Sequence, residues 1–116
     1  MLGGCKTEKI QPYATGLYFT QGGNQLEKLC QEAIIYKNQG FKGIKMKVGL
    51  DIDTDIKHVE AVRKAIGPDI KLMIDANHAY NLKESLELCH KLEELNISFF
   101  EEPVSPEQYD IYAQLR

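Results

Sequence analysis

Two lysines at alternate positions, Lys45 and Lys47, are the first residues of this sequence whose types and spacing could do chemistry. They alternate with Ile44, Met46 and Val48, so in a strand both ammonium groups face one side and the apolar side chains the other. Like charges about 7 Å apart repel, and partial burial also disfavours charge. Both effects are expected to lower a lysine pKa towards the range of a general base. The alternative is an exposed edge strand guarded by its lysines.

Asp75 and Asn77, in the segment IDANHAY, form a second candidate. Asp75 is the last residue of a predicted strand and Asn77 follows two positions later, so both side chains can face the same way. Ligand sites of parallel α/β folds lie beyond the carboxyl ends of the strands. The alternative role for Asp75 is to cap a turn or helix.

Glu101, in the segment FFEEP, ends the next predicted strand. If the two strands are neighbours, about 4.8 Å apart, the carboxylates of Asp75 and Glu101 converge at one rim of the sheet. Such a pair is costly without a cation between the carboxylates or a proton on one of them. Mg²⁺ suits this site because it prefers oxygen ligands and is held by a few carboxylates, water and substrate. The alternative is a solvated acidic turn before Pro103.

Together, a lysine pair and two carboxylates end three successive strands of a repeating unit. This arrangement suits metal-assisted abstraction of the proton α to a carboxylate. In that chemistry Mg²⁺ neutralises the enediolate that forms, and a lysine base takes the proton.

The elements that must position these residues alternate along the chain. Apolar runs bounded by turn residues predict four strands, over residues 15–20, 44–48, 70–75 and 97–101. Amphipathic runs with cap signals predict four helices. They run over 24–38, from a cap within 51–55 to 66 with a stop at Gly67–Pro68, from a capping box of Asn81 and Glu84 to Leu92, and from the Ser105–Pro106 cap to Arg116. The first helix is expected to bury Leu26, Leu29, Cys30, Ala33 and Ile34, and the third Leu82, Leu86, Cys89 and Leu92.

Strand–helix units of nearly constant length predict parallel strands joined by crossover helices. An open doubly wound sheet and a (β/α)₈ barrel are both built this way. Length favours the open sheet, because a full barrel needs roughly 250 residues. The lysine pair favours the barrel, because an open parallel sheet is normally apolar on both faces.

The composition is that of an ordinary globular protein: 116 residues, 43% hydrophobic and 27% charged, with a formal charge of −3. This mildly acidic chain is a poor candidate for binding nucleic acid or a membrane. Charged residues among the first ten leave no signal-peptide core, so the cytoplasm is the expected location. The scattered cysteines Cys5, Cys30 and Cys89 form neither a disulfide framework nor a zinc site and are expected to be buried thiols.

These motifs resemble the enolase superfamily, in particular the group of mandelate racemase and muconate-lactonizing enzyme. The resemblance covers roughly residues 13–116 and rests on GFKGIKMKVG, IDANHAY and FFEEP and on the distances between them. It implies a capping domain followed by a modified TIM barrel, with Mg²⁺ held by three acidic residues on successive strands. It also implies abstraction of the proton α to a carboxylate, leading to racemisation, cycloisomerisation or dehydration.

The resemblance assigns roles residue by residue. Lys47 would be the general base, and Lys45 would lower its pKa and help to hold the substrate carboxylate. Asp75 and Glu101 would be the first two Mg²⁺ ligands. Substrate contacts would come from Asn77, His78 and Tyr18, the last at the end of the first strand. For His78 a structural role is the alternative.

The chain departs from the family pattern in length. The capping domain, the third metal ligand and the opposing acid or base are not found within it. We therefore expect an N-terminal segment (1–14) and a partial barrel domain (15–116), the first half of a TIM-type (β/α) barrel that ends within its fourth helix. Such a half barrel exposes strand edges, so it needs its other half or a partner copy, and a homo-oligomer is possible.

The sequence thus predicts a Mg²⁺-dependent dehydratase or racemase-like isomerase acting on a small hydroxy acid or acid sugar. One alternative is a Schiff-base aldolase using Lys45 or Lys47. A second is a non-catalytic half-barrel remnant. A third, a receiver-type module with Asp75 as phosphoacceptor, needs an acidic pair after the first strand, and TGLYFTQGG has none.

Overall fold

The computed structural model describes residues 9–115 and confirms the predicted α/β class. Four strands form one parallel sheet in the order β1-β2-β3-β4, so each strand pairs with the next one along the chain. The strands are β1 (Ala14–Gly16), β2 (Gly43–Lys47), β3 (Lys71–Asp75) and β4 (Ile97–Glu101). The helices are α1 (Gln25–Asn38), α2 (Ile52–Ile66), α3 (Leu82–Leu92) and α4 (Tyr109–Leu115), with a 3₁₀ helix, η1 (Glu93–Leu95), after α3.

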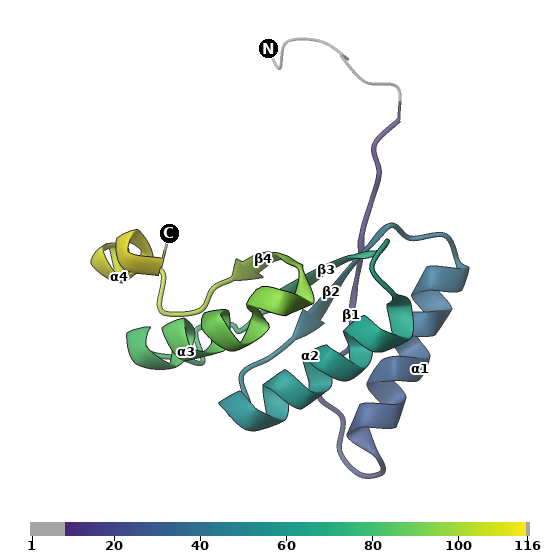
Figure 1. The fold of residues 1–116 in the computed structure, drawn as a ribbon, viewed down its shortest axis with the longest axis horizontal. Coiled ribbons are helices and arrows are strands. Elements are labelled where there is room, and N and C mark those ends of the chain that lie inside the picture. Colours follow the sequence, from purple (N-terminus) through teal and green to yellow (C-terminus); the bar gives the residue numbers. More distant parts are fainter. Residues whose placement is uncertain (1–8, 116) are drawn as a thin grey trace.

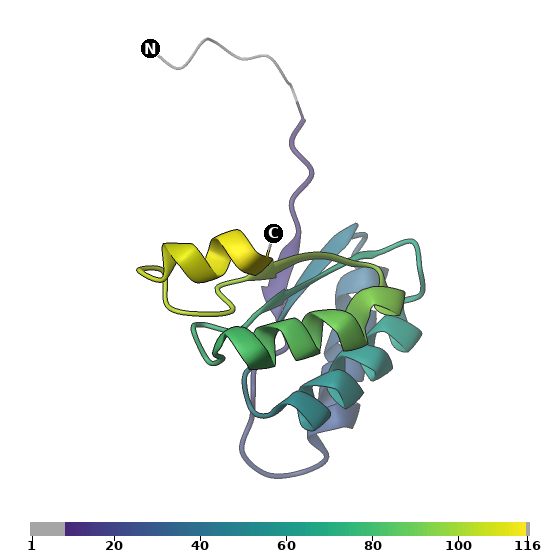
Figure 2. The ribbon, with the colours of Figure 1, turned by 60° about the vertical axis from the view of Figure 1, so that its left-hand side comes forward.

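Three helices cover a single face of this sheet: α1, α2 and α3 form one layer against it, and α4 lies next to α3 (Figures 1 and 2). The core between the two layers is apolar, and its fully buried side chains include Leu29, Ile44, Met46, Val59, Val62, Leu72, Ile74 and Leu88. An open doubly wound sheet carries helices on both faces. The sequential strand order and one-sided cover are instead those of half a (β/α) barrel, as predicted.

Local side-chain chemistry sets where the helices begin and end. Asp51 caps α2 by accepting from the N–H of Thr54 (2.9 Å). Asn81 and Glu84 form the predicted capping box at the start of α3. Gly67 stops α2 with a φ of +78°, a conformation that glycine adopts without strain. These signals are local, which is why the sequence predicts them well.

The first strand is shorter than the predicted 15–20. It ends at Gly16 because the chain turns out of the sheet at Leu17, which has a φ of +52°. The N–H of Leu17 donates to Glu32 Oε1 on α1 (3.1 Å). A side chain of the covering helix thus stabilises the turn that ends the strand.

The last helix also differs from the prediction, because it begins at Tyr109 and not at Ser105–Pro106. The Ser105 hydroxyl donates to the Glu107 carboxylate instead of capping a helix. A turn closed by the N–H of Gln108 on the carbonyl of Ser105 (3.0 Å) then precedes α4.

The buried helix faces are only partly those predicted. In α1, Leu29 and Ala33 are buried, but Leu26 and Ile34 are 38% and 41% exposed. In α3 the buried residues are Ser85, Leu88 and Leu92, and the predicted Leu82, Leu86 and Cys89 are half-buried. The reason is that α3 contacts α2 on one side and α4 on the other, so its apolar surface is divided between two neighbours. Burial raises the pKa of the half-buried thiols of Cys30 and Cys89.

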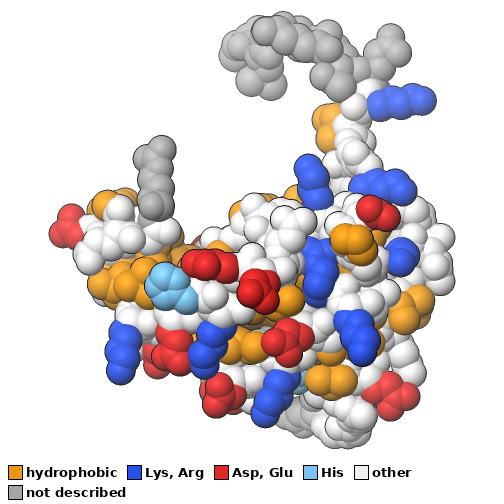
Figure 3. All heavy atoms as spheres, in the orientation of Figure 1, with side chains coloured by type: hydrophobic (Ala, Val, Ile, Leu, Met, Phe, Trp, Pro, Cys, Tyr) orange, Lys and Arg blue, Asp and Glu red, His pale blue; other side chains and the backbone are white. Residues whose placement is uncertain are grey.

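Acidic and basic side chains are interspersed over the view in Figure 3. Over residues 9–115, no helix combines the length and the apolar character needed to cross a bilayer. Part of the predicted N-terminal segment, including Cys5, lies outside the described residues, and the domain bounds 1–14 and 15–116 stay a prediction.

Candidate active site at the carboxyl ends of the strands

Strand register brings three of the predicted residues into one row at the carboxyl end of the sheet. Lys47 on β2 is the register partner of Asp75 on β3, and Asp75 is the partner of Glu101 on β4. Lys45 lies two residues earlier on the same face of β2 and pairs in register with Met73. The predicted convergence of the two carboxylates follows directly from β3 and β4 being neighbours.

The four charged side chains pair with one another. Lys47 Nζ lies 2.6 Å from Asp75 Oδ2. Lys45 Nζ lies 2.6 Å from Glu101 Oε2 and 3.4 Å from Asp75 Oδ2, so its ammonium group bridges the two carboxylates. Two positive and two negative charges therefore compensate one another, as ionised groups withdrawn from water require.

The burial of these side chains is graded. The side chain of Asp75 is 4% exposed, those of Lys45 and Lys47 are 11% and 17% exposed, and that of Glu101 is 37% exposed. The alternative of an exposed edge strand guarded by lysines is wrong, because β2 lies between β1 and β3. The alternative of a freely solvated acidic turn does not fit Glu101, whose carboxylate is ion-paired.

Asp75 is held in its ionised form. Burial alone would raise its pKa, but hydrogen bonds from Lys47 and from the N–H of Asn77 (3.1 Å), together with the charges of Lys47 and Lys45, outweigh burial and hold the pKa below the usual range. A carboxylate that stays charged at neutral pH is suited to binding a cation.

The expectation of a lowered pKa is wrong for Lys45 in this structure. The hydrogen bond to Glu101 raises the pKa of Lys45, burial opposes this, and the charges of Glu101 and Asp75 add to the rise. The sequence argument counted the repulsion between the two lysines but not the carboxylates that each lysine meets. Those partners come from β3 and β4, which are far away in the sequence.

The loops after β3 and β4 hold Asn77 and His78 against Glu102. Asn77 Oδ1 accepts from Lys47 Nζ (2.5 Å), and Asn77 Nδ2 donates to Glu102 Oε2 (3.2 Å). His78 Nε2 lies 2.8 Å from the same Glu102 oxygen. All three residues have positive φ, of 44°, 68° and 46°. Left-handed backbone at non-glycine residues is strained and is found preferentially at functional sites.

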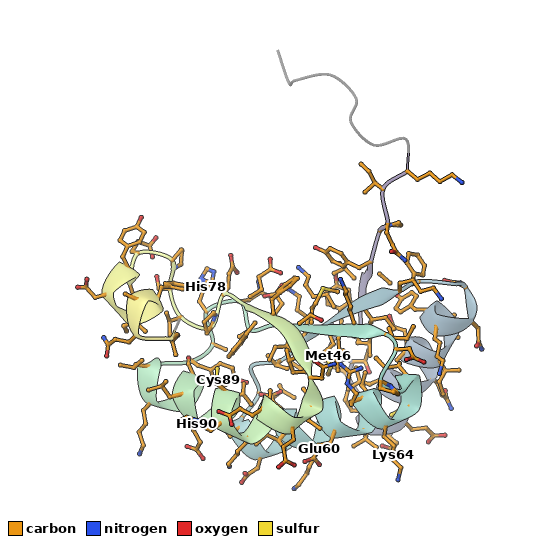
Figure 4. The ribbon with its side chains drawn as sticks, turned by 45° about the horizontal axis from the view of Figure 1, so that its top comes forward. Met46, Glu60, Lys64, His78, Cys89 and His90 are labelled. Carbon is orange, nitrogen blue, oxygen red and sulfur yellow. The ribbon has the colours of Figure 1, made fainter. Side chains whose placement is uncertain are left out.

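The predicted substrate contacts Asn77, His78 and Tyr18 lie at different places in the structure. Asn77 touches the candidate base Lys47, and Figure 4 shows His78 at the end of the sheet next to α4. In the same view Met46 lies between the sheet and the helices, whereas Glu60, Lys64 and His90 lie on the outer side of the helices.

Tyr18 is 52% exposed in the loop after β1, where its carbonyl accepts from Gln25 Nε2 (3.1 Å). Among the described residues, no hydrogen bond joins the Tyr18 side chain to the charged row. A role for Tyr18 in substrate binding stays a prediction.

The donor set of the row fits Mg²⁺. Over residues 9–115, no group of three or more His, Cys, Asp and Glu side chains converges to hold a metal. Two carboxylates, Asp75 and Glu101, do converge, and Mg²⁺ is commonly bound by one or two carboxylates with water and substrate completing the shell. The ammonium group of Lys45 lies between these carboxylates and shows that the position between them favours a cation.

Two features of the site were not predicted from the sequence. Glu102, which was not among the predicted site residues, binds both Asn77 and His78. Asp55, which reads as an ordinary acidic residue in the first turn of a helix, is fully buried and hydrogen-bonded to Tyr80. The two adjacent glutamates of FFEEP are a sequence signal for a role of Glu102. No sequence signal indicates that Asp55 is buried.

Residues 25–116 match the family model of enolase C-terminal domain-like proteins. The chain belongs to the enolase superfamily. The superfamily resemblance inferred from the lysine pair, IDANHAY and FFEEP is therefore confirmed.

Relatives of this enolase-superfamily chain are enzymes. It is 42% identical over 116 residues to the arabinonate dehydratase of Saccharolobus solfataricus, covering 99% of this chain and 31% of the relative. It is 57% identical to the 3,6-anhydro-D-galactonate cycloisomerase of Zobellia galactanivorans, whose crystal structure it matches with a TM-score of 0.91 over 98% of this chain and 31% of that one. The chain thus spans about a third of the length of the relatives it matches.

A dipeptide epimerase of Cytophaga hutchinsonii, crystallised with Mg and a dipeptide, is 33% identical, with a TM-score of 0.85 over 98% of this chain and 30% of that one. Bound Mg is thus found in superfamily members of similar structure. The enzymes named here are a dehydratase, a cycloisomerase and an epimerase, so membership of the superfamily agrees with lyase or isomerase chemistry.

Proposed function

We propose that this chain carries the first half of the active site of a Mg²⁺-dependent enzyme that abstracts the proton α to the carboxylate of a sugar acid. The observation that carries the proposal is the row formed by Lys47, Asp75 and Glu101 at adjacent strand ends, with Lys45 bridging the carboxylates. A base and two cation ligands on one face are what this chemistry requires.

Lys47 is the proposed base, because it is the last residue of β2 and its Nζ is oriented by Asp75 Oδ2 and Asn77 Oδ1. A base must be held in a fixed direction before it can take a proton efficiently. In its neutral form the amine accepts the α-proton, and Asp75 then stabilises the ammonium group that results. Both partners therefore support the charged product of the proton transfer.

Lys45 is proposed to bind the substrate carboxylate. Its ammonium group already lies between two carboxylates and 6.0 Å from the centre of the Tyr13 ring. Asp75 and Glu101 would hold the Mg²⁺ ion. When bound, Mg²⁺ would neutralise the negative charge that develops on the substrate carboxylate.

The substrate class is proposed from two relatives that are at least 42% identical to this chain. Arabinonate and 3,6-anhydro-D-galactonate are both sugar acids, and the two enzymes are 42% and 57% identical to this chain. The dipeptide epimerase is less similar, at 33%. Dehydration and cycloisomerisation can both begin with loss of the α-proton, so the same base serves either outcome.

The test is exchange of the α-proton for deuterium in D₂O, measured by NMR on the intact protein with a panel of sugar acids and dipeptides. We expect exchange with a sugar acid that requires Mg²⁺ and stops on addition of a chelator. Exchange with dipeptides alone would contradict the substrate class. Borohydride trapping of a carbonyl substrate on Lys45 or Lys47, without Mg²⁺ dependence, would replace the proposal by the Schiff-base alternative. Absence of exchange with every substrate would favour a non-catalytic half barrel.

A further inference from the structure

Asp55 is a fully buried carboxylate that the proposed reaction does not use. Its Oδ2 accepts three hydrogen bonds, from the N–H groups of Gly49 and Leu50 (3.0 Å each) and from the hydroxyl of Tyr80 (2.5 Å). Its Oδ1 has no hydrogen-bond partner among the described residues. Burying a carboxylate costs several kcal/mol unless it is well satisfied. A carboxylate that is buried at this cost is expected to hold the segments that donate to it in position.

The three donors belong to two different loops. Gly49 and Leu50 follow β2, two and three residues after Lys47, and Tyr80 lies in the loop after β3. Asp55 on α2 therefore joins the loop behind the proposed base to the loop that follows Asp75.

The loop after β3 is in turn bonded to the loop after β4. The N–H of Tyr80 donates to the carbonyl of Pro103 (3.1 Å), and the N–H of His78 donates to the carbonyl of Glu102 (2.8 Å). The ring of Tyr80 meets that of Phe100 edge to face, with centroids 6.2 Å apart. Tyr80, in the segment after β3, thus bonds to the segment after β4 and is linked to the loop after β2 through Asp55.

The first two loops also touch directly. Gly49 has a φ of +117°, and a Cβ there would lie 2.6 Å from Ala79 Cβ and 3.1 Å from the carbonyl oxygen of Ala76. Only glycine fits so close to the neighbouring loop. At Gly49 the two loops approach each other closely, so a shift of one there affects the other.

The Tyr80 hydroxyl is a permanent donor in this network. Burial, and then the hydrogen bond to Asp55, raise the pKa of the Tyr80 phenol far above its ordinary range. The phenol therefore stays protonated at any pH at which the protein works.

We propose that the Asp55–Tyr80 pair positions Lys47, by locking the loop that follows the base onto the loop that follows β3. Neither residue touches the reacting atoms, so both are positioning residues. The kinetic part of the inference rests on the proposed function. The structural part, the coupling of the two loops, does not.

Tyr80→Phe in the intact protein removes one oxygen and keeps the ring. We expect kcat for α-proton exchange to fall about 10-fold, with KM within about 2-fold, because small displacements of a base cost rate more than binding. Asp55→Asn should give a comparable loss. The double variant should fall no further than the more severe single variant, because both remove the same interaction.

Tyr36→Phe is the matched control. Its hydroxyl donates to the carboxylate of Glu32 (2.7 Å) on α1, a tyrosine–carboxylate pair in contact with none of the four charged residues of the row. It should lower the melting temperature, because it removes a partly buried hydrogen bond, and leave kcat unchanged. If Tyr80→Phe retains kcat within about 2-fold, or loses no more than the control, the pair is merely structural and the proposal is overturned.

Amide hydrogen exchange separates this inference from the proposed function. In Tyr80→Phe, the amides of Gly49 and Leu50 should exchange faster, although the substitution lies in the other loop, and Tyr36→Phe should leave them unchanged. The wild-type protein could exchange no substrate proton while Tyr80→Phe still speeds amide exchange at Gly49 and Leu50. In that case the proposed function fails, and the coupling of the two loops stands. Unchanged protection at Gly49 and Leu50 in Tyr80→Phe would overturn the coupling itself. If Asp55→Asn does not fold, Tyr80→Phe alone tests the proposal.

Discussion

The two ends of the same sheet use positive charge in opposite ways. At the carboxyl end, Lys45 and Lys47 pair with the carboxylates of Asp75 and Glu101. At the amino end, the guanidinium of Arg63 on α2 donates, among residues 9–115, to backbone carbonyls only. It reaches the carbonyls of Gly67 (2.9 Å), Ile70 (2.7 Å), Leu95 (2.9 Å) and Asn96 (2.9 Å).

The difference lies in what the partners can do. Backbone carbonyls cannot leave or titrate, so Arg63 permanently ties the end of α2 to the starts of β3 and β4. Burial lowers the pKa of Arg63, but a guanidinium remains charged in proteins. The ion pairs at the carboxyl end join side chains, which can change partners. One end therefore maintains the fold, and the other is available for chemistry.

The largest effect is expected at the carboxyl end. Lys47→Gln should reduce α-proton exchange in the intact protein by about 10²–10⁴-fold, because it removes the base. Glutamine leaves the buried carboxylate of Asp75 without the charge of Lys47, so the melting temperature should fall as well. Isotope exchange and thermal unfolding on the same sample check both. A variant that keeps its rate would show that another group takes the proton.

Arg63→Leu should destabilise the amino end of the sheet. It should lower the free energy of unfolding by about 2–4 kcal/mol, because charged hydrogen bonds are lost and carbonyls are left unpaired. Arg63→Lys should recover only part of this loss, since an ammonium group cannot match the planar guanidinium. Urea unfolding measures the change, and the exchange rate of the folded fraction should remain normal. A loss of activity without a loss of stability would contradict the conclusion that the amino end of the sheet only maintains the fold.

His78 tests whether strain at the carboxyl end has a structural or a substrate-binding purpose. His78 has a φ of +68°. Glycine adopts this conformation freely, whereas a β-branched residue does not, so His78→Val should be about 1–2 kcal/mol less stable than His78→Gly. Chemical unfolding of the two variants gives the difference. A raised KM in His78→Gly would support substrate contact, and an unchanged KM the structural alternative.

The smallest effect is expected at Asp51, outside both ends. The hydrogen bond from the N–H of Thr54 holds the pKa of Asp51 below its ordinary range. A lowered pKa contributes stability at pH values above the ordinary pKa, and this contribution is lost as the pH falls through the folded-state pKa. Asp51→Asn keeps a neutral cap, so its melting temperature should lie only about 1–2 °C below the wild type at pH 7. The difference should shrink below about pH 4, and a constant difference across pH would rule out the charge as its cause.

Sequence reasoning predicted those parts of the fold that depend on neighbours along the chain. The strand over 97–101, the capping box of Asn81 and Glu84, and the glycine stop at Gly67 are as predicted. The start of α4 was predicted wrongly, because a serine followed by proline is a local cap signal that Glu107 overrides. The face of α3 was predicted only in part: Leu92 is buried as predicted, and two neighbouring helices share the rest of the apolar surface.

For the candidate site, alternation within a strand was enough to place Lys45 and Lys47 on one face, and strand ends were enough to bring Asp75 near Glu101. The roles of these residues in catalysis stay predictions. The direction of the pKa shift of Lys45 was not predictable, because it depends on a carboxylate 56 positions away.

The sequence by itself determined which residue types stand at the strand ends, because strand alternation and helix capping act over a few residues. Only the tertiary structure decided which of these residues compensate one another. It also turned Asp55 inward to Tyr80, 25 positions away, instead of out to solvent. Contacts between distant segments depend on strand register and loop packing, and these are set by the whole sheet with its covering helices.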